Sequence, residues 1–373
     1  MENSICTVEQ LKQFTDLSAK EEKELKQIVK KHPMRVTPYY TSLIDWTNPS
    51  DPIKKMAIPS VKEFDLKGSY DTSAESENTK MPGLQHKYSE TALILATNKC
   101  AMYCRHCFRK RLVGLQTKEV IERFEDAAKY IKQHEQINNV LITGGDPLVL
   151  PNKVIEKFLS ILTENPKIKF IRFGSRAPVT WPSRFEDEEF LRILAKYSRP
   201  SRRIYVVTQF NHPREITRQT IKAVDNLLKA GVIVNNQAVL LKGVNDDPYV
   251  LAKLLNHLVS IGVNPYYVFQ CRPVKRVKSN FQVPLCKATE IVEEAKAHCN
   301  GHSKRFRFIM SHKTGKIEVL GIMDDEIYFK YHQAKNRKKI GKIFTRPVDK
   351  NAGWLEDFKS SPVQLLDAAP YLL

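Results

Sequence analysis

Long apolar runs are missing from this sequence, and none of its segments could cross a bilayer. The N-terminus, MENSICTVEQLKQF, also lacks the basic-then-apolar pattern of a secretory signal peptide, so we expect a cytoplasmic protein. Cysteines are few, and their number, seven in 373 residues, is odd, which argues against a framework of disulfides. No internal repeat occurs beyond an alternation of strand and helix patterns.

Acidic residues are outnumbered by basic ones. The chain has 60 Lys and Arg against 41 Asp and Glu, which gives a formal net charge of +19. An excess of this kind can indicate nucleic-acid binding. However, the densest basic stretch, residues 335–339, lies near the C-terminus, away from the chemical motifs described below. We therefore expect a basic surface that attracts anionic substrates and cofactors, and we expect neither a nucleic acid nor a membrane as partner.

Three zones follow one another along the chain. Residues 1–87 form an N-terminal extension with a predicted helix over 7–31 and a polar segment, 71–82, that we expect to be a linker or mobile loop. Residues 88–300 alternate short β-rich runs with amphipathic stretches. Residues 301–373 form a C-terminal extension with two further predicted strands around a glycine turn.

The central zone predicts an α/β fold. Six strands are predicted at 92–96, 140–143, 170–174, 204–209, 232–240 and 266–270, and helices between them at 120–131, 153–163, 186–197, 217–230 and 249–261. This alternation predicts parallel βαβ units arranged as a wound sheet or a partial (β/α)6 TIM-like barrel. Active sites of such folds lie at the C-terminal ends of the strands. Cys100, Gly144 and Ser175 each follow one of the first three predicted strands.

The most informative motif is CxxxCxxC, formed by Cys100, Cys104 and Cys107. Three thiolates can bind three irons of a [4Fe–4S] cluster and leave the fourth iron open to a small chelating molecule. Zinc is the alternative, but a structural zinc site needs four ligands, and the fourth would have to come from elsewhere, for example from His106. The motif directly after a first βα strand resembles the radical S-adenosylmethionine (SAM) superfamily.

Further segments resemble the lysine 2,3-aminomutase family of that superfamily, in order and spacing. They are CAMYCRHCFRKR, TGGDPL, FGSRAPVTWPSR, TQFNHPREIT, NNQAVLLKGVND and NPYYVFQC. The resemblance implies an isomerase that uses the cluster, SAM and pyridoxal phosphate. In the family, a radical derived from SAM takes hydrogen from the β-carbon of an amino acid held on pyridoxal phosphate, and the nitrogen then moves from the α- to the β-carbon. It also implies a small-molecule amino acid substrate, an electron donor of flavodoxin or ferredoxin type, and a homo-oligomer.

The resemblance also implies roles for individual residues. Lys316 is the predicted attachment point of pyridoxal phosphate, with Lys313 as the neighbour that could substitute because the glycine turn is shorter here. Tyr88 is a second predicted contact of that cofactor, and Arg109 matches the arginine that binds the substrate's α-carboxylate through its planar fork. The residues predicted to bind SAM are Gly144, Gly145, Asp146, Ser175, Arg176 and Gln237.

The chain departs from the lysine-specific members at two positions. Those members place two aspartates around the distal ammonium of lysine, whereas Arg272 and Ser311 stand at these positions here. An arginine would repel a buried ammonium and attract a carboxylate, so we predict an acidic substrate such as glutamate, which Lys275 or Arg276 could also contact. Three alternatives stay open: free lysine, a lysine within a protein such as a translation factor, and an RNA-acting or RNA-binding protein.

Two more departures concern cofactors. Thr91 stands where family members often have an arginine that contacts the cofactor phosphate, which weakens the expectation of pyridoxal phosphate. Some members bind zinc through a C-terminal group of cysteines. Because no cysteine follows Cys299, we predict no such zinc site.

Overall fold

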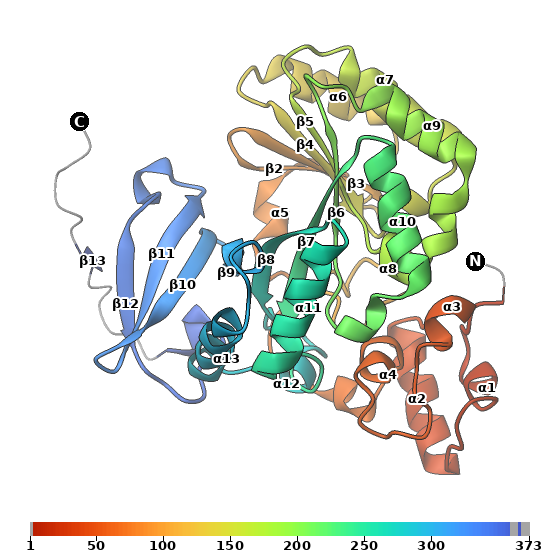
Figure 1. Ribbon diagram of the computed structural model, residues 1–373, viewed down its shortest axis with the longest axis vertical. Coiled ribbons are helices and arrows are strands. Elements are labelled where there is room, and N and C mark those ends of the chain that lie inside the picture. The colour runs from red at the N-terminus through yellow and green to blue at the C-terminus, as the bar shows by residue number, and fades with distance from the viewer. Residues whose placement is uncertain (1–2, 359–364, 367–373) are drawn as a thin grey trace.

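The computed structural model describes residues 3–358 and 365–366. All strands in this part of the chain belong to one sheet, in which the neighbours follow the order of the sequence (Figure 1). The strands are β1 (Thr79–Met81), β2 (Leu84–Tyr88), β3 (Thr91–Thr97), β4 (Asn139–Gly144), β5 (Phe170–Gly174), β6 (Ile204–Thr208), β7 (Ile233–Leu240), β8 (Asn264–Gln270), β9 (Arg307–His312), β10 (Gly315–Met323), β11 (Glu326–Ala334), β12 (Ile343–Pro347) and β13 (Leu365–Leu366).

The middle of the sheet, from β3 to β9, is parallel. The hairpin of β1 and β2 extends it antiparallel beyond β3, and β10 to β13 extend it antiparallel beyond β9. No ladder within the described residues joins β3 to β9, so the barrel is open. The predicted α/β partial barrel is therefore confirmed, and β9 adds a seventh parallel strand to the six that the sequence predicts for the central zone.

Helices connect the parallel strands and cover their outer face (Figure 1). The covering helices are α6 (Phe124–Gln133), α7 (Asn152–Thr163), α9 (Glu188–Tyr197), α10 (Arg218–Lys229), α11 (Pro248–Ser260) and α13 (Leu285–Ala297), and shorter ones are α8 (Ala177–Thr180) and α12 (Lys278–Phe281). The N-terminal extension contributes α1 (Val8–Leu11), α2 (Ala19–Lys31), α3 (Pro38–Thr41), α4 (Pro52–Ala57) and α5 (Glu75–Asn78). None of the described helices is long and apolar enough to cross a membrane.

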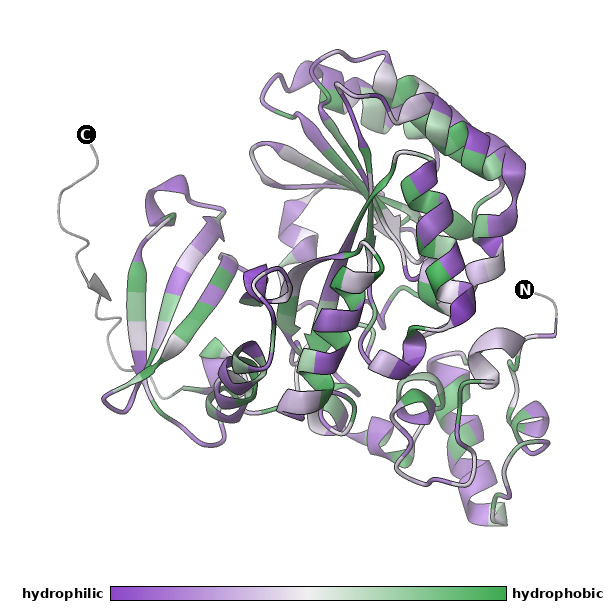
Figure 2. Ribbon diagram, in the orientation of Figure 1, coloured by the Kyte–Doolittle hydropathy of each residue, from purple (hydrophilic) through white to green (hydrophobic). Residues whose placement is uncertain are grey.

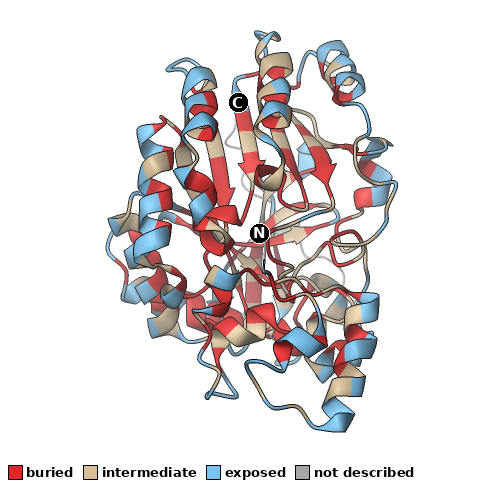
Figure 3. Cartoon of the chain, turned by 90° about the vertical axis from the view of Figure 1, so that its right-hand side faces the viewer, coloured by how far each residue is buried: buried red, intermediate tan, exposed pale blue. Residues whose placement is uncertain are grey.

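The periodicity of each element decides which of its faces is buried. Helix α10 buries Thr220, Ala223, Val224 and Leu227, which lie three or four residues apart on one face. On the covering helices, the apolar and buried residues face the sheet and the polar residues face outward (Figures 2 and 3). Each fully buried Val or Leu side chain contributes about 1.5–3 kcal/mol, so this shared core holds the strand ends that carry the motifs.

Two of the predicted helices differ from the structure by more than two residues. The helix predicted over 7–31 is two helices, because Ser18 caps a new helix start through a capping box with Glu21. The helix predicted from residue 120 begins at Phe124. The reason is that the Ile121 N–H donates to the Leu95 carbonyl at 2.9 Å, which ties this stretch to β3 instead.

The polar segment 71–82 is not a linker, and that expectation is wrong. It forms α5 and β1, and it buries Glu75 and Asn78. Its polar composition is misleading because these polar groups form hydrogen bonds and ion pairs inside the protein and not with solvent. The Asp71 carboxylate accepts the backbone N–H groups of Glu75 and Ser76 at 2.7 and 3.0 Å.

The rest of the N-terminal extension packs on the loop that follows β3. Glu63, fully buried, forms ion pairs of 2.7 Å with both Arg105 and Lys110 of that loop. The Arg105 guanidinium also donates to the carbonyl of Pro33 at 3.0 Å. Burial raises the pKa of Glu63, but Arg105 and Lys110 outweigh it and hold that pKa low, at about 2. The extension therefore fixes the cysteine loop through buried charges as well as apolar contacts.

Candidate active site

A cavity of about 420 Å³ opens inside the barrel, where the C-terminal ends of the parallel strands meet residues of both extensions. Its lining is strongly cationic among the described residues. The charged side chains are the cations Lys87, Arg109, Arg172, Arg176, Arg272 and Lys316, and the carboxylates Glu75 and Asp146. Neutralising this excess requires anions, so the cavity is built for ligands that carry phosphate or carboxylate groups.

Cys100, Cys104 and Cys107 all line this cavity. Burial raises the pKa of Cys100, and it raises that of Cys107 to about 11, with further contributions from the neighbouring thiols. Bound metal would stabilise the thiolate forms instead. No three His, Cys, Asp or Glu side chains in residues 3–358 are grouped to hold one metal ion. Three cysteine thiols that line one cavity fit a cluster, in which each thiolate binds a different iron.

The glycines after β4 are required by close contact with the cysteine loop. A Cβ on Gly144 would lie 2.4 Å from the Thr97 carbonyl oxygen, and one on Gly145 would lie 2.3 Å from that of Lys99. Gly144 also has a φ of +115°, which side-chain-bearing residues rarely adopt. The Asp146 N–H donates to the Lys99 carbonyl at 2.8 Å. The predicted SAM motif therefore lies directly against the cysteine loop.

Asp146, Ser175 and Arg176 form one hydrogen-bonded group across the ends of β4 and β5. The Asp146 carboxylate accepts from the Ser175 hydroxyl at 2.7 Å and from the Arg176 backbone N–H at 2.8 Å. The Arg176 side chain then points to the cysteines, and its Nη1 donates to Cys104 Sγ at 2.9 Å. Its Nη2 pairs with the buried Glu215. In this group Asp146 positions Arg176, and Arg176 supports negative charge on the Cys104 sulfur.

His106 lies deep beside the same cysteines. Its Nε2 contacts Gln209 Oε1 at 3.2 Å, whereas its buried Nδ1 has no hydrogen-bond partner among the described residues. Burial, together with the charge of Arg176, lowers the pKa of His106 to about 3, so the ring is neutral. The unpaired nitrogen of a neutral ring in this cavity is an orphaned polar atom that a ligand could satisfy.

Lys316 of β10 enters the cavity opposite the cysteine loop. It forms no ion pair or hydrogen bond within the described part of the chain, and its Nζ lies 4.7 Å from the centre of the Phe269 ring. Burial, with the charges of Arg272, Arg172 and Lys87, lowers the pKa of Lys316 to about 7. A neutral amine near pH 7 is the form that attacks an aldehyde, so this side chain fits the predicted attachment of pyridoxal phosphate.

Lys313, the predicted substitute for Lys316, lies outside the cavity. It is exposed and pairs with Glu356 at 3.0 Å. Lys275 and Arg276 do not line the cavity either; Arg276 instead donates to the Glu63 carbonyl oxygen at 2.8 Å. Tyr88 at the end of β2 and Gln237 of β7, the predicted contacts of pyridoxal phosphate and SAM, do line the cavity, and burial raises the pKa of Tyr88.

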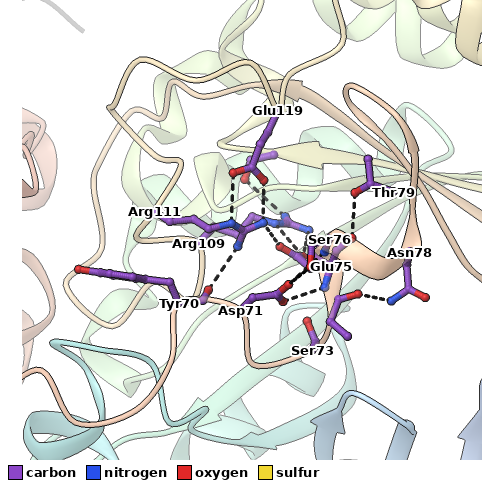
Figure 4. Close-up of polar contacts among 12 residues, drawn as sticks. Tyr70, Asp71, Ser73, Glu75, Ser76, Asn78, Thr79, Arg109, Arg111 and Glu119 are labelled. Carbon is purple, nitrogen blue, oxygen red and sulfur yellow. Dashed lines mark hydrogen bonds and ion pairs between the residues drawn. The ribbon is translucent and has the colours of Figure 1, made fainter.

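Arg109 is already engaged by protein groups (Figure 4). Its Nη2 pairs with Glu75 at 3.1 Å and its Nε donates to the same oxygen at 3.3 Å. Its Nη1 donates to Thr143 Oγ1 at 3.1 Å. Glu75 also pairs with Arg111, which Glu119 holds from the other side. A substrate carboxylate at Arg109 would therefore share the guanidinium with Glu75.

Arg272, at the end of β8, is held differently. Its Nη1 donates to Ser73 Oγ and its Nη2 to Ser311 Oγ, both at 2.9 Å. It has no carboxylate partner within the described residues, although burial lowers its pKa to about 10. Arg272 is a part-buried cation that forms no ion pair within the described residues and interacts with the Glu75 carboxylate only at longer range, so it can take up a ligand's negative charge in the cavity.

Sequence reasoning missed many polar and aromatic residues of this cavity, among them Ser73, Lys87 and Arg172. Lys87 donates to the carbonyl of His312 at 2.6 Å, and Arg172 Nε donates to Asn139 Oδ1 at 2.8 Å. The signal for Arg172 was present, since a basic residue inside an apolar strand must find a polar surrounding. For Ser73 no signal existed, because its importance depends on a contact with a residue about 200 positions away.

Comparison with known proteins points to one group. A model of the radical SAM superfamily matches residues 94–255. An Aquifex aeolicus protein assigned to L-lysine 2,3-aminomutase is 41% identical over 93% of each chain. The L-lysine 2,3-aminomutase of Clostridium subterminale is 40% identical over 80% of this chain and 71% of its own. The glutamate 2,3-aminomutase of Clostridioides difficile is 38% identical over 81% of this chain and 70% of its own.

Among solved structures, a radical SAM methyltransferase from Sphaerobacter thermophilus is similar over 61% of this chain and 68% of that chain, at 13% identity and a TM-score of 0.38. The lysine-specific and glutamate-specific relatives are similar to this chain to nearly the same degree. Overall sequence identity therefore does not distinguish a lysine substrate from a glutamate substrate. The distinction has to be argued from the side chains that line the cavity.

Proposed function

The chain belongs to the lysine 2,3-aminomutase family of the radical SAM superfamily, and from this premise we propose that its substrate is an acidic amino acid such as glutamate. Members of this family are amino acid 2,3-aminomutases, which are isomerases. The proposed reaction moves the amino group from the α- to the β-carbon of the acid. The observation that carries the proposal is Arg272, a cation in the cavity without a carboxylate partner.

The charges of the cavity favour a second carboxylate over an ammonium. Both lining carboxylates are in use, since Glu75 pairs with two arginines and Asp146 holds Ser175 and Arg176. A lysine ammonium at the far end of the cavity would lie near Arg272 without a free acid to pair with. Because like charges repel strongly at low dielectric, this arrangement discriminates against lysine.

The hydroxyls beside Arg272 support the same reading. Ser73 and Ser311 accept from Arg272 and keep their own O–H hydrogens for another acceptor. A carboxylate bound at the guanidinium could accept these hydroxyl hydrogens as well. Arg109 is the proposed holder of the α-carboxylate, as the family resemblance implies, so the two ends of a dicarboxylic amino acid would each meet an arginine.

The residues present fit the cofactors. Radical SAM chemistry implies a [4Fe–4S] cluster and SAM, and Cys100, Cys104 and Cys107 would hold the cluster. We propose pyridoxal phosphate as a third group, with Lys316 as its covalent anchor. Arg172 would supply a cation for the phosphate, which Thr91 cannot supply. When bound, pyridoxal phosphate stabilises a radical next to the migrating nitrogen. The protein side chains fix both carboxylates and exclude water from the cavity.

We also propose that reduction of the cluster depends on an external electron donor of flavodoxin or ferredoxin type, and that the enzyme is a homo-oligomer. Both follow from the family and not from contacts in this chain.

The test is a substrate screen with anaerobically reconstituted enzyme. Lysine, glutamate, aspartate and neutral amino acids are incubated separately with SAM and a reductant, and β-amino products are identified by NMR. We expect β-glutamate to form and β-lysine not to form. Turnover of lysine with no turnover of either acid would overturn the proposal.

Two variants test whether Arg272 binds the side-chain carboxylate of the substrate. Arg272→Ala should raise the KM for the acidic substrate about 100-fold or more, because it removes a buried charged partner of the carboxylate. Lys275→Ala is the matched control, since Lys275 is a neighbouring cation that does not line the cavity. An unchanged KM in the Arg272 variant would place the carboxylate elsewhere.

A further inference from the structure

The two arginines assigned to the substrate share one aromatic side chain. The Arg272 guanidinium lies 4.1 Å from the centre of the Phe108 ring, and that of Arg109 lies 4.7 Å from it. Phe108 is the residue after Cys107, so its backbone is part of the cysteine loop. A flat, rigid ring in contact with two guanidinium groups limits how closely they approach each other.

A single short segment, residues 71–78, holds the same two arginines from the other side. Ser73 accepts from Arg272 at 2.9 Å, and Glu75, two residues later, pairs with Arg109 at 3.1 Å. Both residues are buried. Because Ser73 and Glu75 are two residues apart in one segment, they hold the guanidinium groups of Arg272 and Arg109 at a fixed distance from each other.

The segment itself is firmly held (Figure 4). The Asp71 carboxylate accepts the N–H groups of Glu75 and Ser76, and Thr79 Oγ1 donates to the Glu75 carbonyl at 2.8 Å. Ala74 has a φ of +55°, in the left-handed region that alanine rarely adopts. Such a conformation persists where the surroundings determine it, as these contacts do between Ser73 and Glu75.

A ring of contacts then joins the segment to the opposite wall of the cavity. Arg272 donates to Ser311, and Lys87 donates both to the Ser73 carbonyl at 3.3 Å and to the His312 carbonyl at 2.6 Å. Ser73, Arg272, Ser311 and Lys87 therefore link the 71–78 segment, the end of β8, the end of β9 and β2. The position of Arg272 is set by all four elements together.

We propose that Phe108, Ser73 and Glu75 set the separation of the two arginines and so select the side-chain length of the acidic substrate. This inference rests on the proposed function and adds to it. Glu75 is a positioning residue that acts through Arg109, Ser73 positions Arg272 in addition to offering its hydroxyl to the carboxylate, and Phe108 is the spacer that both guanidinium groups contact. An amino acid whose two carboxylates match this separation binds to both arginines at once, whereas a homologue one methylene shorter or longer reaches only one of them well.

The first test compares Ser73→Ala with the wild-type holoenzyme on aspartate, glutamate and 2-aminoadipate. The variant loses one hydrogen bond to a charged group, so we expect its KM for the preferred acid to rise about tenfold. We expect kcat to change little and the preference between acids of different length to flatten. Ser76→Ala is the matched control, because Ser76 is exposed and lies in the same segment without touching either arginine. We expect this control to keep the wild-type preference.

The second test uses binding alone. Succinate, glutarate and adipate differ only in length and lack the amino group, so their effect on the thermal midpoint of the holoenzyme reports the spacing without turnover. We expect one of the three to raise the wild-type midpoint most, and Phe108→Leu to move that maximum to another length. Iron content is measured in parallel, since Phe108 adjoins Cys107, and the conclusion is drawn from the order of the three diacids in iron-loaded protein.

The outcomes separate this inference from the proposed function. If wild-type enzyme turns over an acidic amino acid but both variants keep the wild-type length preference within twofold, the spacing inference is wrong and the proposed function stands. If wild-type enzyme turns over no acidic amino acid, both fall. A flattened preference in the Ser73 variant with a shifted maximum in the Phe108 variant supports the inference.

Discussion

The two ends of the cavity are built in different ways. At the cysteine end, the residues that would hold the cluster lie within eight positions of one another, and the glycine motif is pressed against them so closely that a Cβ would collide. At the substrate end, Ser73 and Lys87 come from the N-terminal extension, Arg272 follows β8, and Ser311 and Lys316 come from the adjacent strands β9 and β10. The cysteine end is therefore encoded locally, whereas the substrate end exists only in the folded protein.

The comparison teaches how one fold can keep its radical chemistry and change its substrate. The candidate cluster ligands are local in sequence, although residues from elsewhere, such as Glu63 and Arg176, hold their loop in place. At the substrate end, Arg272 is held by single hydrogen bonds to Ser73 and Ser311, so we expect a substitution there to change the ligand without unfolding the barrel. The following predictions test whether the two ends differ in this way.

The largest effect is expected at the cysteine end. Cys104→Ser should remove activity to the limit of detection, because an alcohol does not replace a thiolate on iron. Iron content and the visible absorption of anaerobically reconstituted protein measure the loss. Cys286→Ser is the control, since Cys286 lies outside the cavity, and it should retain iron and activity. Full activity in the Cys104 variant would mean that this loop does not hold the cluster.

The second largest effect is expected at the substrate end, on the attachment of pyridoxal phosphate to Lys316. Lys316→Ala should abolish covalent attachment of pyridoxal phosphate, because no other cavity amine occupies that place. Borohydride reduction followed by peptide mass analysis locates the attachment. Lys313→Ala removes an exposed neighbour from the same turn and should leave the attachment intact. Cofactor found on Lys313, or on Lys87, would contradict the assignment.

A third prediction concerns the anchor of the cysteine loop. Glu63→Gln should lower the free energy of unfolding by about 3–5 kcal/mol, because it leaves Arg105 and Lys110 buried without their counter-charge. The midpoint of urea denaturation measures this. Glu90→Gln removes a surface partner of Arg337 instead and should cost at most about 1 kcal/mol. Equal effects would mean that Glu63 is not a buried anchor.

The same carboxylate also predicts a pH dependence of stability. Because the pKa of folded Glu63 is about 2, below its ordinary value, its contribution to stability is fully present at neutral pH. That contribution should be lost as the pH falls from about 4.5 toward 2. The Gln variant should show a smaller loss over this range, and parallel curves for both proteins would contradict the assignment.

The smallest expected effect concerns the rate at which pyridoxal phosphate attaches to Lys316. With a pKa near 7, the Lys316 amine is mostly charged at pH 6 and mostly neutral at pH 8. The attachment rate of pyridoxal phosphate to cofactor-free enzyme should therefore rise about tenfold per pH unit below 7 and level off above it. Stopped-flow absorption measures the rate. A midpoint near that of an ordinary lysine would show that the cavity does not tune this amine.

Much of the fold was predictable because the parallel strands are short apolar runs and the helices carry one-sided patterns. The strand predicted at 170–174 has the same bounds in the structure. The prediction failed at residues 71–82, where composition alone indicated a linker. A polar sequence does not show whether its side chains face water or pair with an arginine inside the protein. In the folded protein, the contacts of this segment with Asp71, Arg109 and Arg272 show that it is part of the packed structure.

By itself, the sequence indicated a radical SAM enzyme of the aminomutase family, because its cysteine and glycine motifs resemble that family in order and spacing. The same resemblance predicts that Arg272 and Ser311 stand where lysine-specific members have aspartates. Only the tertiary structure decided that Arg272 forms no ion pair within the described residues, that the Lys316 side chain lies in a cationic cavity, and that Phe108, Ser73 and Glu75 contact the two arginines. The physical reason is that charge balance depends on distances through space, which the order of residues does not contain.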